Sequence, residues 1–249
     1  MSDREEPQAA PIHIGTSGWH YAHWKGPFYP RDLPDEEMLA YYARHLRTVE
    51  INNTFYRLPA QETLARWHKT VPEGFLFAVK ASRYITHMKK LGDPAPALVL
   101  LDRVSTLGDA LGPILFQLPP HWHGDARRLC AFLQTLPAGY RYAFEFRDAS
   151  WYTEEIYAVL QDHGAAFCIH DYHGVESPQK VVGDWVYVRL HGPWGAYEGE
   201  YTVQQLASWA EALLAWAKQG KECYLYFNND MAGYAAQEAQ KLQAMTTNL

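Results

Sequence analysis

The sequence predicts an α/β protein, a single (β/α)8 TIM barrel. Short β-rich runs alternate with amphipathic helical patterns along most of the chain. The chain has 249 residues, and about 250 residues is a typical length for such a barrel. No stretch rich in Gly, Ser or Pro divides it. We therefore expect one TIM-barrel domain over residues 12–249, preceded by a polar, disordered N-terminal tail over residues 1–11.

The strands are predicted from runs rich in β-branched and aromatic residues. They are expected at 12–17, 48–52, 75–81, 114–118, 142–147, 166–171, 186–191 and 223–228. An open doubly wound sheet is the alternative fold. Such a sheet usually carries a glycine-rich phosphate loop after its first strand, and the run from Gly15 to Gly18 lacks that spacing. Gly18 is expected to allow a close backbone approach or a positive φ.

Helices are predicted between most of these strands, each from an apolar stripe at helical spacing or from a capping residue. Thr202 with Gln205 also matches a capping box. Only the segment 172–185 is too short and polar for a full helix, so a loop or a single turn is expected there. The residues near which the helices are expected to begin are Asp35, Gln61, Pro96, Asp125, Thr153, Thr202 and Gly233.

Composition narrows the class of protein. The chain is 48% hydrophobic and 20% charged, which suits a large buried core. Its formal net charge of -6 disfavours a protein that coats duplex nucleic acid, because such proteins usually carry a basic excess. No apolar stretch has the length of a membrane-spanning helix, and the start lacks a signal-peptide pattern. We expect a cytoplasmic protein with no membrane partner.

The cysteine and histidine spacing predicts neither a disulfide framework nor a zinc site. Cys130, Cys168 and Cys223 are widely spaced, and none belongs to a Cys-x-x-Cys pair. No His-x-x-x-His pair occurs either. We therefore expect no cofactor and no tightly bound metal, while a single weakly held divalent ion stays open.

Strand parity places a set of polar side chains inside the predicted barrel. Alternate strand residues face inward, and the others pack beneath the helices. In most strands the apolar residues share one parity, so the polar residues of the other parity are expected inside. The sixth strand fits either Cys168 with His170 or Ile169 with Asp171. The expected inward residues are Glu50, Asn52, Lys80, Gln117, Glu145, Arg147, Arg189, His191, Tyr226 and Asn228.

Most of these polar residues fall at the C-terminal ends of their strands, where TIM barrels build their active sites. A ligand site is therefore favoured. The alternative is a structural network in which these acids and bases only neutralise one another. Asn228 is expected to hydrogen-bond a polar group in the pocket, and Asp230 is expected to cap the last helix.

Aromatic residues in the predicted βα loops are suited to stacking a sugar, a base or another flat ligand. The sequence contains nine Trp residues, and several of them fall in these loops. Some of these side chains are also expected to seal the barrel mouth. The aromatic loop residues are Trp19, Tyr21, Trp24, Tyr56, Trp122, Trp151, Trp194 and Tyr197.

The inward cations outnumber the inward carboxylates, which predicts a small phosphate- or carboxylate-bearing ligand. Glu145 and Glu50 are the candidate general acid and base. Lys80 is a candidate base or amine nucleophile, and His191 is the alternative proton carrier. The candidate ligand-binding residues are Arg147, Arg189, Asn52, Tyr56, Trp19, Tyr21, His87, Gln117, Trp151, Tyr226, Asn228 and Asp230.

Several sequence strings resemble one family. They are Ile14-Gly15-Thr16-Ser17-Gly18-Trp19, Val49-Glu50-Ile51-Asn52-Asn53-Thr54-Phe55-Tyr56-Arg57, Leu115-Phe116-Gln117-Leu118-Pro119-Pro120, Glu145-Phe146-Arg147, Arg189-Leu190-His191-Gly192 and Tyr226-Phe227-Asn228-Asn229-Asp230. Together they resemble domain of unknown function family 72, the YecE-like proteins, from about Ile12 to Leu242. The resemblance implies a TIM barrel but no reaction. Members have been likened to endonuclease IV-type DNA-repair enzymes and sugar isomerases, whose metal clusters the inward cations here would repel.

Three other functions stay open beside the anion site. One is nucleic-acid binding or phosphodiester cleavage at the same rim. Another is a glycoside hydrolase using Glu50 and Glu145, which requires carboxyl groups about 5–10 Å apart and is disfavoured if each acid is salt-bridged to arginine. The third is a noncatalytic ligand-binding barrel. If the protein is an enzyme, an acid/base hydrolase, lyase or isomerase is expected; the sequence sets no oligomeric state.

Overall fold

The computed structural model describes residues 9–172, 175–195 and 197–247. Most of the expected N-terminal tail, residues 1–8, lies outside the described residues. At its end the backbone is bonded to the barrel, because the Ala10 N–H donates to the Ala217 carbonyl at 2.9 Å and the Pro11 carbonyl accepts from the Cys223 N–H at 3.0 Å.

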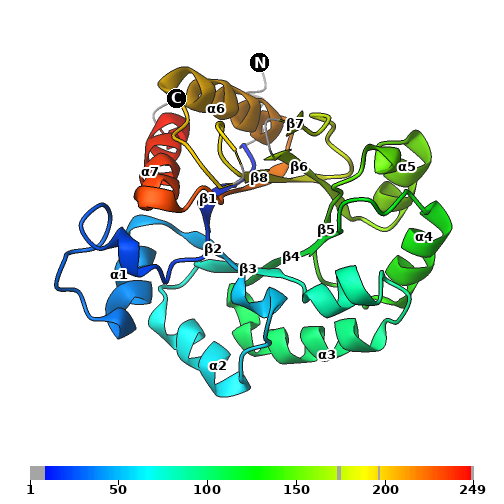
Figure 1. Ribbon diagram of the computed structural model, residues 1–249, viewed down its shortest axis with the longest axis horizontal. Coiled ribbons are helices and arrows are strands. Elements are labelled where there is room, and N and C mark those ends of the chain that lie inside the picture. The colour runs from blue at the N-terminus through cyan, green and yellow to red at the C-terminus, as the bar shows by residue number, and fades with distance from the viewer. Residues whose placement is uncertain (1–8, 173–174, 196, 248–249) are drawn as a thin grey trace, which may run out of the picture.

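The strands close into a barrel, which confirms the predicted fold (Figure 1). Neighbouring strands of the barrel run parallel, and pairing of Ala143 with Ala166 joins β5 to β6 and closes the ring. The barrel strands are β1 (Ile12–Ser17), β2 (Thr48–Ile51), β3 (Leu76–Lys80), β4 (Leu111–Gln117), β5 (Tyr142–Glu145), β6 (Ala166–Tyr172), β8 (Trp185–Leu190) and β9 (Glu222–Phe227).

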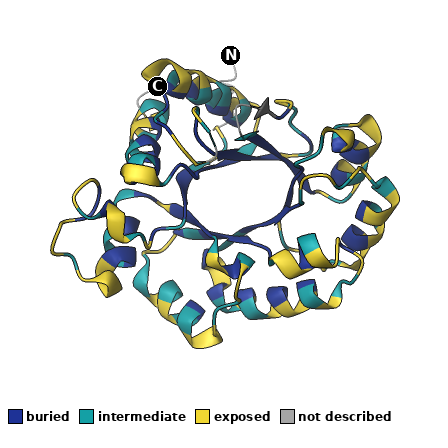
Figure 2. Ribbon diagram, in the orientation of Figure 1, coloured by how far each residue is buried: buried dark blue, intermediate teal, exposed yellow. Residues whose placement is uncertain are grey.

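Seven α-helices surround the described barrel and bury one face each against it (Figure 2). None of the helices in the described ranges is both long and apolar enough to cross a membrane. The helices are α1 (Met38–His45), α2 (Gln61–Thr70), α3 (Ala95–Val104), α4 (Ala126–Thr135), α5 (Glu154–Asp162), α6 (Val203–Lys218) and α7 (Tyr234–Thr247).

Most of the predicted caps are confirmed. The Asp125 side chain accepts from the Arg128 N–H at 2.9 Å, the Thr153 hydroxyl accepts from Ile156, and Thr202 with Gln205 forms the capping box. Asp35 is a correction: it begins a 3-10 turn before α1, makes no side-chain cap and bonds Lys25 at 2.8 Å. Because the Asp35 carboxylate is bonded to Lys25, it does not accept from the backbone N–H groups at the start of the helix.

The segment between β6 and β8 has no helix in its described part, as expected. In its place the two-residue β7 (Val175–Glu176) pairs antiparallel with the end of β6, through Tyr172 and Val175. This short hairpin was not predicted, since two residues carry too little pattern to be recognised. On this side of the barrel α5 packs against β6, where the Tyr157 and Phe167 rings lie 5.3 Å apart, and α6 lies nearby (Figure 1).

The lower barrel interior is apolar and fully packed. It is filled by Ala78, Leu115, Ala143, Ala166, Cys168, Trp185, Tyr187, Tyr224 and Tyr226. The position of Cys168 in this cluster settles the ambiguous strand, because Cys168 and His170 face inward and Asp171 faces outward. Tyr226 is a correction: it is fully buried and its hydroxyl lies 2.8 Å from Thr48 Oγ1, below the mouth. Parity predicted its direction but not its depth.

Gly18 has a φ of +90°, as expected for the turn that follows β1. A Cβ atom at this position would lie 2.6 Å from the Tyr21 hydroxyl oxygen. Tyr21 donates that hydroxyl to the Ser17 carbonyl at 2.7 Å. The glycine therefore lets the loop after β1 fold tightly back over the barrel mouth.

Candidate functional site

Arg189 lies between two carboxylates at the top of the barrel interior. Its Nη1 donates to Glu145 Oε2 at 2.7 Å and its Nη2 to Glu50 Oε1 at 2.8 Å. Glu50 also accepts from the hydroxyl groups of Ser17 and Tyr187. Arg189, Glu50 and Glu145 are all fully buried. We call these three residues the central triad; in it both carboxylates are bonded to the same guanidinium.

Arg147 covers the triad on the side of the mouth. Its Nε and Nη2 both contact Glu145, and Nη2 also lies 3.0 Å from His191 Nε2. The guanidinium carbon sits 3.6 Å from the centre of the Tyr172 ring. The remaining nitrogen, Nη1, is buried and has no hydrogen-bond partner among the described residues. An unsatisfied buried donor at a barrel mouth is a ready contact for a ligand oxygen.

Glu145 is ill suited to the expected role of general acid. Burial raises the pKa of its carboxyl, but Arg147 and Arg189 outweigh burial and hold the pKa well below its ordinary value. Glu145 therefore stays ionised, and its oxygens are engaged by two arginines. Glu50 is engaged in the same way by Arg189. Both acids are better placed to fix the arginines than to carry protons.

Lys80 differs from the two arginines. It ends β3, keeps only 9% of its surface exposed, and its side chain makes no hydrogen bond or ion pair within the described ranges. Its Nζ lies 4.4 Å from the centre of the Phe55 ring. Burial and the nearby Arg189 lower the pKa of Lys80 to about 8, although the two buried glutamates act in the opposite direction. Lys80 is thus a buried cation without a contacting anion.

His191 and Asn228 meet at the mouth, as the parity rule predicted. His191 Nδ1 lies 3.1 Å from the Asn228 side-chain nitrogen, which confirms that Asn228 points inward and contacts a neighbouring strand's polar group. Burial lowers the pKa of His191 well below its usual range, so the imidazole is neutral near pH 7. His191 Nε2 therefore faces Arg147 without adding charge to the pocket.

His87 and Gln117 complete this side of the mouth. His87 packs edge-on against Phe55, with ring centres 5.1 Å apart, and its Nδ1 lies 2.8 Å from Thr86 Oγ1. Burial and the neighbouring Lys80 lower the pKa of His87 to about 4, so it is neutral at pH 7. Gln117 is nearly buried and donates to the Leu118 carbonyl at 2.8 Å.

An aromatic cleft of about 540 Å³ opens beside the mouth, between the loops that follow β1 and β2 and the helices α1 and α2. Trp19, Tyr21 and Asn52 line it, as predicted for ligand-binding residues. Asn52 Oδ1 is buried without a partner in the described chain. Trp67 also lines the cleft, with its ring edge-on to Trp19 at 4.8 Å. Sequence analysis missed Trp67 because it lies on the apolar stripe of α2.

One aromatic residue expected to contact a ligand lies elsewhere. Trp151 is a correction: it is fully buried, stacks on Phe146 at 4.7 Å and donates its indole N–H to the Trp122 carbonyl, so it belongs to the core outside the barrel. Tyr56 is exposed, with its ring 5.1 Å from that of Phe55, and its contact with a ligand stays a prediction. Loop position alone did not distinguish packed from exposed aromatics.

Asp230 links two loops at the rim and does not cap α7, contrary to expectation. Its backbone carbonyl accepts from the Trp24 indole at 2.9 Å and lies 2.7 Å from His23 Nε2. Its side chain makes no cap hydrogen bond. The backbone carbonyl of Asp230 therefore holds the loop that carries His23 and Trp24, and a sequence pattern does not predict contacts of backbone carbonyls.

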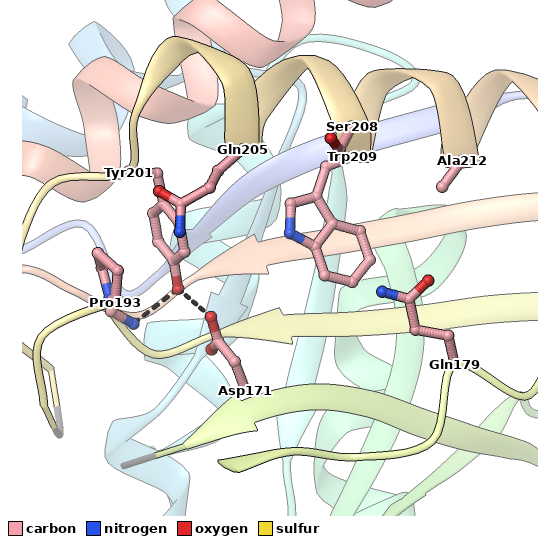
Figure 3. Close-up of a pocket in the computed structure, with 9 residues that line it drawn as sticks. Asp171, Gln179, Pro193, Tyr201, Gln205, Ser208, Trp209 and Ala212 are labelled. Atoms are coloured by element: carbon pink, nitrogen blue, oxygen red, sulfur yellow. Dashed lines mark hydrogen bonds between the residues drawn. The ribbon is translucent and has the colours of Figure 1, made fainter. Parts of the chain in front are cut away.

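A second cavity, of about 390 Å³, lies on the outer face of the barrel where the helix after β6 is missing (Figure 3). Asp171 points into this region, and its carboxylate accepts from the Tyr201 hydroxyl and from the His191 N–H. The Tyr201 hydroxyl in turn accepts from the Gly192 N–H at 2.7 Å. Asp171 therefore holds the loop after β8, and with it His191, from behind the barrel wall.

Glu238 holds the same loop from α7. It is fully buried, and its two oxygens accept from the Tyr201 N–H at 2.5 Å and from the Asn229 side chain at 2.7 Å. Asn229 also donates to the Gly199 carbonyl at 2.8 Å. Sequence analysis missed this contact, since a single Glu in a polar helix gives no signal. Burial raises the pKa of Glu238 from its ordinary 4.5 to about 7.

Glu238 is expected to make the fold less stable as the pH rises. The folded state keeps this proton up to about pH 7 while the unfolded state loses it near pH 4.5, so the stability from the neutral carboxyl is lost between these values. The loss amounts to about 2–3 kcal/mol of unfolding free energy. Urea titrations at pH 5 and pH 8 on wild type and Glu238→Gln measure it as the difference between the two proteins.

Glu211→Gln is the matched control, because Glu211 is exposed on α6 and does not contribute to the shift at Glu238. This variant is expected to follow the wild-type pH profile. A Glu238→Gln profile that also follows wild type would contradict the prediction.

Among the residues that the structure describes, no group of three or more His, Cys, Asp or Glu side chains is arranged to hold a metal ion. The acids at the mouth are instead bonded to arginines. The described site offers hydrogen-bond donors and positive charge, a combination that suits an anion.

The comparisons with known proteins agree with this architecture. The family model described as "Protein of unknown function DUF72" matches residues 13–248. The chain is similar to UPF0759 protein YunF of Bacillus subtilis, with 26% identity over 93% of each chain. It is also similar to UPF0759 protein YecE of Escherichia coli, with 29% identity over 57% of this chain and 51% of that protein.

A solved structure gives the same result at the level of the fold. The crystal structure of a DUF72 family protein from Thermotoga maritima superposes with a TM-score of 0.86 and 27% identity, over 96% of this chain and all of that one. The relatives' descriptions state no substrate or reaction.

Proposed function

Because the chain belongs to the DUF72 family, whose name carries no reaction, we propose from its geometry that the barrel mouth binds a small molecule bearing a phosphate or carboxylate group. The observation that carries the proposal is Lys80, a buried ammonium with no contacting anion in the described chain. Burying a cation without a counter-charge is costly, and an anionic ligand supplies that charge.

The charge balance of the mouth supports this proposal. Arg147 and Arg189 contact Glu145 and Glu50, so these four charges cancel, while His191 and His87 are neutral. Lys80 leaves a surplus of positive charge when it is protonated. Arg147 Nη1 offers a second donor, and the Asn52 side chain leads to the aromatic cleft. We assign the anionic group to Lys80 and Arg147, and the ligand's flat body to the cleft beside Trp19.

Lys80→Met is expected to weaken binding of a phosphate- or carboxylate-bearing probe about tenfold or more, because it removes a charged hydrogen-bond donor. The probes are glycerol 3-phosphate and lactate, measured by isothermal titration calorimetry. Lys80→Arg keeps the charge and is expected to retain most of the affinity. Equal binding by wild type and Lys80→Met would refute the proposal.

The same titration is expected to depend on pH. The protonated ammonium of Lys80 attracts the anion, and its pKa is about 8, so the affinity for lactate falls as the pH rises through that value. An ordinary exposed lysine would keep its charge to much higher pH. Lys80→Arg, whose guanidinium stays charged, is expected to show no fall between pH 7 and pH 9.

A glycoside hydrolase is disfavoured by the central triad, because Arg189 is salt-bridged to Glu50 and to Glu145. Neither carboxyl is free to act as nucleophile or acid. A noncatalytic barrel would bind the same probes with the same dependence on Lys80, and it would show no turnover.

Nucleic-acid binding is the second candidate, and one observation favours it. On the loops after β3 and β4, the Nζ atoms of Lys89 and Lys90 lie over the rings of Tyr84 and Trp122, at 5.4 Å and 5.8 Å from the ring centres. Cations beside aromatic faces suit single-stranded nucleic acid. Binding of a fluorescent oligonucleotide that falls steeply with salt would support this candidate.

A further inference from the structure

Lys80 combines two properties that an amine nucleophile requires. It ends β3 at the barrel mouth, keeps 9% of its surface exposed, and holds its Nζ 4.4 Å from the centre of the Phe55 ring. It also lacks a carboxylate partner that would fix its proton, within the residues described. A lysine desolvated beside other cations loses its proton more readily and becomes nucleophilic.

We propose that Lys80 forms a Schiff base with an aldehyde or ketone that carries a phosphate or carboxylate group. The inference rests on the proposed function, because the anionic group is bound by the same mouth. Arg147 Nη1, the buried donor without a partner in the described chain, is the contact that would hold that group near Lys80.

The step balances without an oxidant or reductant. The neutral amine of Lys80 adds to the carbonyl carbon, forming a C–N bond while the C=O π electrons move to the oxygen. That oxygen takes up two protons, one from the attacking nitrogen and one from solvent, and leaves as water. The nitrogen lone pair then forms the C=N bond of a protonated imine.

His87 is the imidazole beside the reacting amine. Lys80 and His87 pack against the same Phe55 ring, and burial with the nearby Lys80 keeps His87 neutral at pH 7, so it offers a hydrogen bond to the reacting groups without adding charge. Its Nδ1 is engaged with Thr86, and no hydrogen bond involves Nε2 in the described chain. The imine would withdraw electrons from the adjacent carbon–carbon and carbon–hydrogen bonds, which favours lyase or isomerase chemistry over hydrolysis.

The other lysines do not share this environment. Lys80 is the buried lysine of the described chain, whereas Lys25, Lys89, Lys180 and Lys241 are more exposed and pair with acids. Lys89 lies on the loop after the same strand and pairs with Asp93 at 3.7 Å. Lys89→Arg is therefore a matched control for Lys80→Arg.

Borohydride trapping tests the inference on the full chain. The protein is incubated with pyruvate or dihydroxyacetone phosphate, reduced with sodium borohydride, and analysed by peptide mass spectrometry. Wild type and Lys89→Arg are expected to carry the reduced adduct on Lys80, with a rate that rises with pH toward 8. Lys80→Arg is expected to lose at least about tenfold of the total adduct. Thermal unfolding checks that this variant is folded, and glycerol 3-phosphate binding checks its mouth.

The outcomes separate the two proposals. Binding of glycerol 3-phosphate or lactate by wild type, without an adduct from either carbonyl probe, overturns the Schiff base and leaves the anion site standing. Failure of wild type to bind any of these anions overturns both. Adducts spread evenly over the exposed lysines, or unchanged in Lys80→Arg, also overturn the Schiff base.

Discussion

Replacing Arg189 with methionine is expected to destabilise the fold by about 3–5 kcal/mol, because it leaves Glu50 and Glu145 buried without their shared cation. Burying a carboxylate is tolerable only when its charge is compensated and its oxygens are bonded. Methionine fills much of the same volume but supplies no donor. Urea unfolding monitored by circular dichroism measures the loss as a shift in midpoint at constant slope.

Arg141→Met is the matched control. Arg141 also bonds a carboxylate, Glu222, at 2.6 Å, but its side chain is 43% exposed. We expect a cost of about 1 kcal/mol or less for it, because water replaces the lost partner. Adding Glu50→Gln to Arg189→Met removes the carboxylate that is left without a cation, so this double variant is expected to recover part of the loss. An Arg189→Met cost as small as that of Arg141→Met would contradict the proposed energetics.

The central triad also shows what strand parity can predict and what it cannot. Parity placed Glu50, Glu145 and Arg189 inside the barrel, because the apolar residues around them share the outward phase. Parity gives no partners, however. In the sheet β8 pairs with β6 and β9, whereas Glu50 lies on β2 and Glu145 on β5. Arg189 reaches both acids across the interior. This contact depends on the closure of the barrel, on the length of the arginine side chain and on its two terminal nitrogens.

The aromatic residues show where sequence patterns fail. Trp19 and Trp151 both follow a strand in a loop, yet Trp19 lines a cleft and Trp151 stacks within the core. Trp67 fits the buried stripe of α2 by its spacing and instead shares the cleft with Trp19. For Trp19 and Trp151 the position of the side chain depends on how far the loop folds back, and for Trp67 it depends on the loop that packs against α2; neither hydrophobic period nor loop position encodes this.

Gly15→Ala is expected to cost about 4 kcal/mol or more, or to prevent folding. A Cβ atom at Gly15 would lie 2.1 Å from the Thr48 carbonyl oxygen and 2.9 Å from its carbon. These are backbone atoms of β2, so the clash is relieved only by moving one strand from the other. Thermal and urea unfolding of the variant measure the cost.

Gly112→Ala separates this clash from the general effect of filling a strand glycine. In β4 a Cβ atom at Gly112 would meet backbone atoms of Phe77 and Ala78 at 3.3–3.4 Å, which a small shift relieves. We expect a change of about 1 kcal/mol or less there. A Gly15→Ala cost no larger than that of Gly112→Ala would show that the first two strands can separate freely.

The Gly15 substitution is expected to reach the candidate site as well as the fold. The strands that Gly15 brings together pair through Thr16 with Val49 and through Ser17 with Glu50. Ser17 donates its hydroxyl to the Glu50 carboxylate, the partner of Arg189. Forcing β1 outward would stretch that contact and loosen the triad beneath Lys80. Any folded Gly15→Ala protein is therefore expected to bind glycerol 3-phosphate more weakly than Gly112→Ala, and equal affinities would mean that the triad does not support the mouth.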